Sequence, residues 1–338
     1  MLIKIESLKN HLSKNISKVY VISSDEQLLL LEAADCIRKF AISYGYTDRK
    51  TFYIDKNFKW EQLNLISSEN SLFGDKKIID LRFFSGQINN SGTEFLLGYL
   101  NKLQFIDNAI MLISLPKLNW KMKNSNWIIS LQKNAIFIEI PSIERSGLKK
   151  WIVQRMSLQN QTLDDSGIEY LNTQLEGNLL AANQEIIKLG LIYPKKKLSL
   201  KEIKSAVLSV ARYDVYNLSE AILSNDKTRL TKMIYGLKNE GEPLPIVLWV
   251  IIQEIRMLIE FKNGILKGEN IHYLFKNLKI WGSKQKLVQN SMKKIKVEKL
   301  EKILKDFAQI DRIVKGLQSN KFVGGSWEEI INLSIKIF

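Results

Sequence analysis

The sequence predicts an α/β domain followed by two all-α parts, and three observations support this fold class. In the first 140 residues, nearly continuous apolar runs alternate with helical patterns, which is typical of a mainly parallel sheet covered on both faces. After Pro141 and Ser142 the patterns are helical only. A chain of 338 residues, 45% of them hydrophobic, is long enough for two or three domains.

The first part is expected to contain five strands. The first strand, residues 19–22, is β-branched and aromatic, and Ser23, Ser24 and Asp25 after it are candidate N-caps for a helix from Glu26 to about Ser43. The other strands are expected at residues 51–54, 77–83, 109–115 and 135–140, with helices at residues 60–68, 94–103 and 120–132.

The helical remainder is expected to form two domains, so the predicted boundaries are 1–141, 142–210 and 211–338. Pro243 and Pro245 fit the start of a long apolar helix. The acidic pairs Asp164-Asp165 and Glu328-Glu329 are expected to open helices, where carboxylates suit the positive end of the helix dipole. The middle helices are expected at residues 143–156, 164–174, 179–191 and 199–210, and the chain is expected to be helical from Asp214 onward.

Several classes of site are poorly supported by the composition. Cys36 is the single cysteine, which excludes an internal disulfide and any cysteine-rich zinc module. His11 and His272 are far apart in sequence, so a metal site or a Ser/Cys-His relay is not expected. The N-terminus has no secretory signal, and the most apolar run, residues 244–252, is too short to span a bilayer. We therefore expect a cytoplasmic protein without a metal or other cofactor.

The loop after the first strand lacks the chemistry of a phosphate-binding loop. Such a loop needs glycines, whose backbone N–H groups wrap the phosphates, and a lysine that reaches the terminal ones. Here no glycine precedes Gly45, and Asp25 and Glu26 would repel phosphates. The Gly-x-Gly-x-x-Gly pattern and a magnesium-binding acidic pair are also missing, and Asp80 stands alone in the third strand. We expect no nucleotide-binding or catalytic residues and no ATP hydrolysis.

The net charge of +15 raises the question of a nucleic-acid partner. Lysine dominates, with nine arginines among 50 basic residues, and residues 261–300 carry ten lysines against two glutamates. The plainer interpretation of this stretch is a solvated helix face, and the alternative is direct DNA binding. The candidate basic face comprises Lys279, Lys284, Lys286, Lys293, Lys294 and Lys296.

Residues 71–74, Ser-Leu-Phe-Gly, place two large apolar side chains in a connection between a helix and a strand. Exposing such a side chain forfeits roughly 1.5–3 kcal/mol, so an exposed pair often serves a partner. The alternative is that Leu72 and Phe73 belong to the core, with Gly74 as a helix cap.

The chain resembles the delta subunit of bacterial DNA polymerase III in an ordered series of segments. Residues 18–30 look like the opening of that family, and residues 71–77 resemble its clamp-contact segment. Further similar segments follow in the same order at residues 176–181, 217–223, 241–243 and 280–281, so the resemblance covers almost the whole chain.

This resemblance implies a degenerate ATPase-like sheet domain, a small helical domain and a helical collar domain. It implies a clamp-loader subunit of the replicative DNA polymerase complex, a nucleotidyltransferase. Its partners in the hetero-oligomeric ring include subunits of the gamma/tau and delta-prime types, and ATP is hydrolysed by sister subunits other than delta and delta-prime. The subunit binds the sliding clamp and opens its ring for loading onto primed DNA. The family's Leu-Phe pair, which enters an apolar pocket on the clamp, carries over to Leu72 and Phe73, and Ser71 matches by position.

Two other identities are weighed against this one. The delta-prime subunit shares the three-domain plan, but it typically has four zinc-binding cysteines and a Ser-Arg-Cys motif. Cys36 follows Asp35 and matches neither feature. A transferase with an atypical phosphate loop is the other alternative, and tight ATP binding to the isolated chain would favour it.

Overall fold

The computed structural model describes residues 1–63, 76–194, 197–208, 211–293, 295–317 and 325–337. The chain divides into two compact units. The first unit combines Met1–Asn172 with Leu179–Val207, and the second combines Thr173–Asn178 with Leu208–Phe338. The separation of residues 142–210 from the sheet as a domain of their own stays a prediction.

A six-stranded sheet organises the first unit, and all its pairs are parallel over the described residues, as predicted. The strand order is β1-β6-β2-β5-β4-β3. The short edge strand β1 was not predicted, because two residues carry no periodicity. The strands are β1 (Leu2–Ile3), β2 (Val19–Ser23), β3 (Tyr46–Ile54), β4 (Lys76–Phe83), β5 (Ala109–Leu115) and β6 (Ile136–Glu139).

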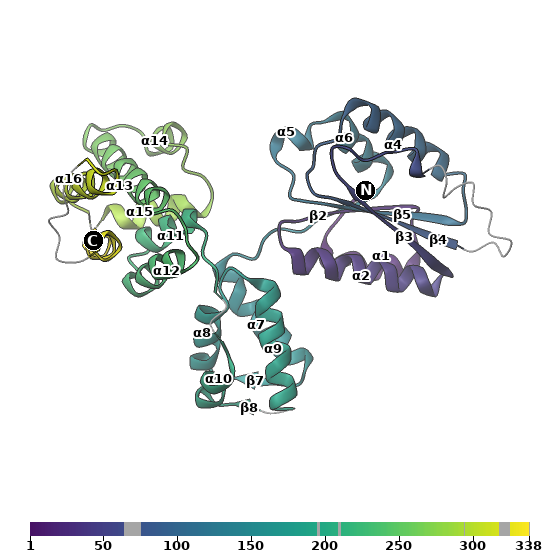
Figure 1. Ribbon diagram of the computed structural model, residues 1–338, viewed down its shortest axis with the longest axis horizontal. Helices are drawn as coiled ribbons and strands as arrows, with labels where there is room; N and C mark the ends of the chain where they lie inside the picture. Colours follow the sequence, from purple (N-terminus) through teal and green to yellow (C-terminus); the bar gives the residue numbers. More distant parts are fainter. Residues whose placement is uncertain (64–75, 195–196, 209–210, 294, 318–324, 338) are drawn as a thin grey trace. The chain divides into compact units, whose positions relative to one another are not determined.

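Helices cover both faces of this sheet (Figure 1). Helices α1 (Leu8–Lys14) and α2 (Gln27–Ser43) lie on one face, and α4 (Asn90–Leu103), α5 (Trp120–Lys123) and α6 (Asn126–Asn134) lie on the other. Alternate residues of β2 sort accordingly, because successive strand side chains point to opposite faces. Tyr20 and Ile22 join the core beneath α1 and α2, whereas Val19 and Val21 join the core beneath α4 and α6.

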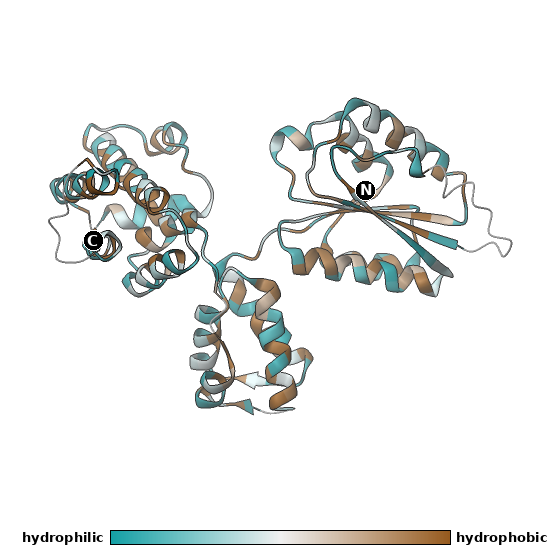
Figure 2. Cartoon of the chain, in the orientation of Figure 1, coloured by the Kyte–Doolittle hydropathy of each residue, from teal (hydrophilic) through white to brown (hydrophobic). Residues whose placement is uncertain are grey.

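Two predicted helices of this part differ from expectation. The helix expected at residues 120–132 is two helices, because Ser125 has extended backbone and its hydroxyl donates to the carbonyl of Met122 at 2.6 Å. The helix expected at residues 60–68 lies largely outside the described residues. Figure 2 shows apolar and polar residues mixed along the helices.

The remainder of the first unit is mainly helical, but it contains two short strands that the sequence did not predict. Strands β7 (Thr162–Leu163) and β8 (Lys197–Leu198) pair in parallel. Asp164 opens α8, as expected for an acidic pair, because its carboxylate accepts from the N–H of Gly167 at 2.7 Å. The helices are α7 (Arg145–Leu158), α8 (Asp165–Gln174), α9 (Leu179–Ile192) and α10 (Leu200–Ala206).

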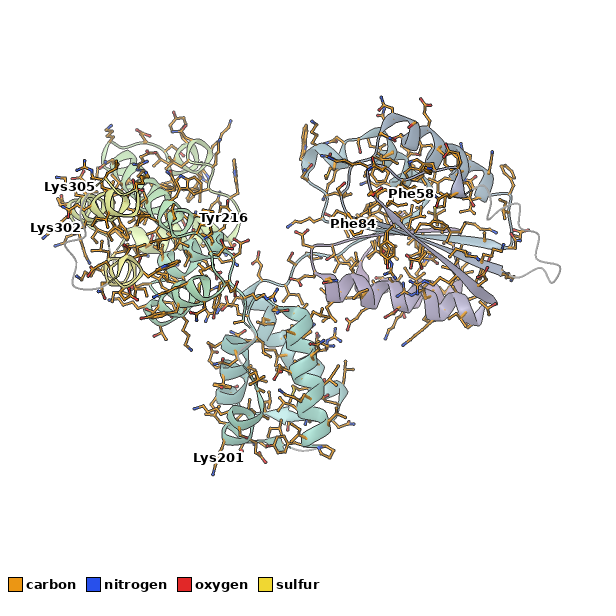
Figure 3. All side chains as sticks on the ribbon, viewed as in Figure 1. Phe58, Phe84, Lys201, Tyr216, Lys302 and Lys305 are labelled. Atoms are coloured by element: carbon orange, nitrogen blue, oxygen red, sulfur yellow. The ribbon has the colours of Figure 1, made fainter. Side chains whose placement is uncertain are left out.

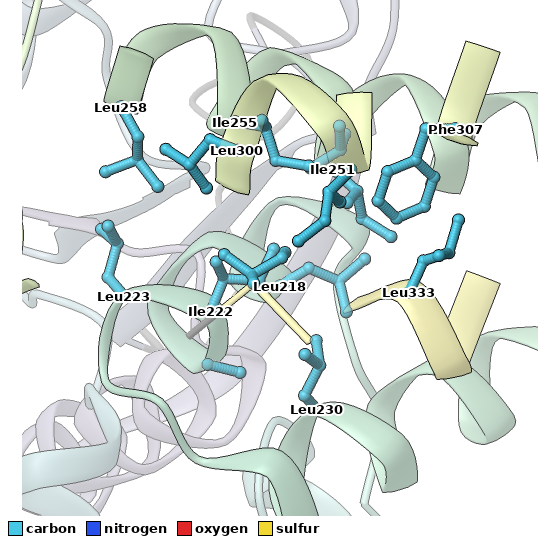
Figure 4. Close-up of a cluster of buried hydrophobic side chains, with 14 of the residues drawn as sticks. Leu218, Ile222, Leu223, Leu230, Ile251, Ile255, Leu258, Leu300, Phe307 and Leu333 are labelled. Carbon is cyan, nitrogen blue, oxygen red and sulfur yellow. The ribbon is translucent and has the colours of Figure 1, made fainter. Parts of the chain in front are cut away.

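The regular elements described in the second unit are all helices, as predicted, and they pack around the long helix α13 (Leu244–Leu266). Pro243 is the N-cap residue of α13, as the sequence indicated. Figure 4 shows Ile251, Ile255 and Leu258 of α13 facing apolar side chains of neighbouring helices. The other helices are α11 (Leu218–Leu223), α12 (Lys227–Asn239), α14 (Ile271–Asn277), α15 (Ser283–Met292), α16 (Val297–Val314) and α17 (Ser326–Ser334).

A buried ion pair fixes residues 173–178 within the second unit. Arg229 of α12 bonds to Glu176 and reaches Glu220 at 3.2 Å, and only 6% of the Arg229 side chain is exposed. Burial alone lowers the pKa of Arg229, but the bonds to Glu176 and Glu220 outweigh it and raise that pKa. Arg229 therefore stays charged, and moving Glu176 away would leave this buried guanidinium without the closer of its two carboxylate partners.

Gly177 beside this pair is required by two independent constraints. Its φ of +78° is in the left-handed region, and a Cβ atom at this position would lie 1.9 Å from the carbonyl oxygen of Arg212. The N–H of Arg212 donates to the carbonyl of Glu176 at 2.9 Å, so the two segments are held together.

We predict that Gly177→Ala destabilises the second unit by more than the 1–2 kcal/mol or so that a left-handed alanine costs by itself. Gly268→Ala is the matched control, because Gly268 has a φ of +79° and open space around its Cβ position. Calorimetric unfolding of both variants measures the difference. Equal losses would show that the close approach of Arg212 carries no energetic weight.

Candidate functional site

The carboxyl ends of β2 and β5 form a point where the chain leaves the sheet in opposite directions. Strand β2 leads into α2 on one face, and the neighbouring strand β5 leads into α5 and α6 on the other. In open α/β sheets, ligands bind in the crevice outside such a point. A cleft of about 340 Å³ lies here, and its lining includes Ser24, Asp25, Leu115 and Pro116.

The loop after β2 is fixed by bonds to the loop after β5. The hydroxyl of Ser23 donates to the carbonyl of Pro116 at 2.9 Å, and Asp25 accepts from the N–H of Lys117 at 3.2 Å. The prediction that Ser23, Ser24 or Asp25 caps α2 was wrong. The N-cap residue is Glu26, since the hydroxyl of Ser24 already accepts from the N–H of Glu26 at 3.0 Å.

Carboxylates occupy the start of α2. Burial, and secondly repulsion from Asp25, raise the pKa of Glu26 above its ordinary value. A polyphosphate placed here would meet Asp25 and Glu26 in place of the glycine N–H groups that normally receive it. The carboxyl groups at the start of α2 therefore disfavour the binding of a polyphosphate here.

A cluster of arginines surrounds Asp80 at the β3–β4 side of the same cleft. Asp80 of β4 is completely buried, and its Oδ2 accepts from Arg38 at 3.4 Å, Arg49 at 2.5 Å and Arg82 at 3.3 Å. Arg38 also bonds to Asp35. Three of the nine arginines of the chain thus share one buried carboxylate, so a positive charge remains around it.

Sequence reasoning treated Asp80 as isolated and missed this cluster. The parallel register pairs Thr51 with Asp80 and Tyr53 with Arg82, so these residues share one face of the sheet with Arg49. The available signal was the placement of polar residues on one face of each strand, with Arg49 and Tyr53 on β3 and Asp80 and Arg82 on β4. It becomes informative only when the register between the two strands is known.

Two exposed aromatic rings complete this part of the cleft. Tyr53 and Phe84 stack with their ring centroids 6.0 Å apart, and the Arg82 guanidinium lies 5.7 Å from the centre of the Tyr53 ring. Phe84 is 73% exposed although it directly follows the buried end of β4. Figure 3 labels Phe84 among the side chains of the sheet domain.

The predicted basic face is only partly present as a free surface. Lys279, Lys286, Lys293 and Lys296 are exposed, and Trp281 among them is 62% exposed. Lys284, however, donates to the buried carboxylate of Glu254 at 2.8 Å, so its positive charge is largely neutralised by that ion pair. Lys294 lies outside the described residues.

The predicted clamp-contact residues Ser71, Leu72 and Phe73 also lie outside the described residues. In the part of the chain that the structure describes, no group of three or more His, Cys, Asp or Glu side chains is arranged to hold a metal ion. Across that same part, every helix is too short or too polar to cross a membrane.

Fold and site together define a class of protein: a parallel α/β sheet whose first loop lacks phosphate-binding groups, followed by a mainly helical segment and a helical second unit. Comparison with known families specifies it further. The family described as "DNA polymerase III, delta subunit" matches residues 20–141, and "DNA polymerase III delta subunit, C-terminal domain" matches residues 212–325. The chain belongs to the DNA polymerase III delta subunit family.

Individual relatives agree with this assignment over nearly their full length. The chain is 26% identical to DNA polymerase III subunit delta of Haemophilus influenzae, with 98% of each chain covered. It is 24% identical to the same subunit of Escherichia coli, covering 98% of this chain and 94% of that one. The solved structure of the Bacillus subtilis DNA clamp loader delta protein shares the fold, with a TM-score of 0.52, 18% identity and coverage of 98% and 99%.

Proposed function

We propose that this chain is the clamp-loader subunit that binds the sliding clamp of the replicative DNA polymerase and opens its ring. The observation that carries this proposal is the family match over residues 20–141, because that range contains Ser71, Leu72 and Phe73. Family models match both the N-terminal and the C-terminal part of the chain. A clamp contact is therefore the simplest explanation for the two adjacent apolar residues of this segment.

In this proposal Leu72 and Phe73 are the anchors that enter an apolar pocket on the clamp. Two adjacent large apolar side chains form a compact hot spot, and a hot spot supplies most of the binding energy of an interface. Ser71 lies beside them and is assigned to the contact by its position. The bound subunit opens the ring only if it favours the open form over the closed one.

The subunit is proposed to hydrolyse no ATP itself. Asp25 and Glu26 at the start of α2 support this part of the proposal, since their carboxyl oxygens would face the phosphate oxygens of a polyphosphate placed there. The energy for the loading cycle then comes from sister subunits that hydrolyse ATP, in a hetero-oligomeric ring that contains subunits of the gamma/tau and delta-prime types. The chain contributes binding energy, needs no cofactor and belongs to the polymerase complex without catalysing a step.

We further propose the division of labour among three domains, 1–141, 142–210 and 211–338. The first binds the clamp, the second is a small helical domain, and the third joins the sister subunits in a collar. The assembled complex would contact primed DNA in the cytoplasm, at the nucleoid and replisome.

A second candidate role is direct DNA contact through the basic face. The exposed Trp281 beside Lys279 and Lys286 favours it, because single-stranded binders combine aromatic rings with lysines. This role is compatible with the first, since such a contact would act inside the assembled loader.

The test of the main proposal is capture of the bacterial sliding clamp by the purified chain. Capture by the wild-type chain, with loss of capture by the Leu72→Ala/Phe73→Ala variant, would support both the function and the site. Capture that survives the double substitution would contradict the assignment of the site.

A further inference from the structure

The cleft at the carboxyl ends of β2, β4 and β5 has no role in clamp binding as proposed above. Its volume of about 340 Å³ is within the usual range of ligand pockets, roughly 300–1,000 Å³. Residues 71–73 precede the start of β4 at Lys76, whereas the cleft is lined by Arg82 and Phe83 at the end of that strand. The cleft is thus a second candidate site at the far end of β4.

Its two ends differ in charge. At the end of β2, Asp25 and Glu26 disfavour a polyphosphate, as described above. At the ends of β3 and β4, the arginines around Asp80 leave a positive charge next to two exposed rings. A ligand for this end therefore carries negative charge and a planar group that can stack on Tyr53 or Phe84.

Arg82 has the donors to hold such a charge. A guanidinium group has five N–H donors. Arg82 uses one toward Asp80, at 3.3 Å, and one toward the Tyr53 hydroxyl, at 3.5 Å. The donors that remain lie beside the stacked rings, because the guanidinium is 5.7 Å from the centre of the Tyr53 ring. A ligand at this end of the cleft can therefore bind a phosphate to Arg82 and stack a planar group on a neighbouring aromatic ring.

A second guanidinium lies next to that of Arg82. Arg49 of β3 bonds to Oδ2 of Asp80 at 2.5 Å, and Arg82 reaches the same oxygen at 3.3 Å, so the two positive groups lie side by side. Strand β3 is the last strand in the order of the sheet, so Arg49 lies at an edge. A polymer can place two adjoining phosphates against the two groups, whereas a mononucleotide offers them a single phosphate.

We propose that this cleft binds single-stranded nucleic acid, with one base against Phe84 and Tyr53 and the adjoining phosphates at Arg82 and Arg49. Stacking on aromatic rings combined with a positively charged groove is the general mode of sequence-tolerant single-strand binding. An acidic peptide is the less favoured occupant, because its carboxylates would use the arginines but leave the two ring faces without a partner.

The test is the binding of the full chain to a fluorescent oligothymidylate about ten nucleotides long, measured by anisotropy at low salt. Phe84→Ala removes one exposed ring, and Phe105→Ala is the matched control because Phe105 is 88% exposed elsewhere on the same domain. We expect binding to weaken about tenfold in Phe84→Ala, the lower range of a lost base stack, and to stay unchanged in Phe105→Ala.

Competition experiments identify the ligand. Thymidine monophosphate is expected to compete weakly, and ATP no better, because of the carboxylates at the start of α2. If the monophosphate competes as strongly as the unlabelled oligonucleotide, the cleft binds a nucleotide, but the proposal that its ligand is a polymer is wrong. Equal competition by polyglutamate, or equal oligonucleotide binding by Phe84→Ala and wild type, would overturn the inference.

The result is independent of the proposed function. Phe84→Ala is expected to capture the sliding clamp like the wild-type chain, and Leu72→Ala/Phe73→Ala is expected to bind the oligonucleotide like the wild-type chain. A chain that binds the oligonucleotide through Phe84 but never captures a clamp would contradict the proposed function and leave this inference standing.

Discussion

The Leu72→Ala/Phe73→Ala variant is expected to bind the sliding clamp at least about 100-fold more weakly than the wild-type chain. Truncating one interface hot spot costs about 2 kcal/mol or more, and each 1.4 kcal/mol is a factor of ten in affinity. Because neighbouring hot spots are not additive, the summed cost is only an upper guide. Surface plasmon resonance on immobilised clamp measures the loss, which should fall mainly on the dissociation rate.

Trp120→Ala is the control for this measurement. Trp120 is a large apolar side chain that is 81% exposed in α5, so its removal tests whether any exposed aromatic residue contributes to clamp binding. We expect Trp120→Ala to retain wild-type affinity. An equal loss in both variants would indicate non-specific apolar adhesion, and no loss in the double variant would place the clamp contact elsewhere.

Asp80→Ala is expected to destabilise the first unit by about 3–5 kcal/mol, the usual cost of removing one partner from a buried ion pair. Asp80 is fully buried and is the acceptor shared by Arg38, Arg49 and Arg82. Without it, three guanidinium groups would repel one another, and Arg38, which is 9% exposed, would lose its buried partner.

Hydrogen exchange resolves this effect by unit. Peptides from β2 and β5 should lose protection in Asp80→Ala, while peptides from α13 in the second unit should keep it. Asp35→Ala is the matched control, since Asp35 also bonds to Arg38 but its side chain is 58% exposed. We expect Asp35→Ala to change stability by no more than about 1 kcal/mol. Similar losses in the two variants would show that the burial of Asp80 is not what matters.

The extent to which the sequence predicts this fold depends on the length of each element. The fourth predicted strand, residues 109–115, has the observed bounds of β5, because a largely apolar run of seven residues between Asn108 and Pro116 has few other solutions. Strands β1, β7 and β8 have two residues each and escape any periodicity argument. They exist because tertiary contacts place them beside longer elements.

The candidate site divides in the same way. The absence of a phosphate-binding loop could be predicted from residues 23–27 alone, because the motif of such a loop is a short continuous segment. The arginine cluster was not, since Arg38 and Arg49 precede Asp80 by 42 and 31 residues and meet it only after the sheet forms. The Leu72–Phe73 pair remains a prediction from sequence and resemblance, because it lies outside the described residues.

Release of a loaded clamp by the chain alone, without ATP, is the sharpest test of ring opening. The wild-type chain alone is incubated, without nucleotide, with its cognate sliding clamp preassembled on circular DNA, and the clamp that remains on the DNA is measured over time. We expect the wild-type chain to release the clamp and the Leu72→Ala/Phe73→Ala variant to leave it on the DNA. Clamp that stays on the DNA at saturating wild-type chain, at the rate seen without it, would contradict the account.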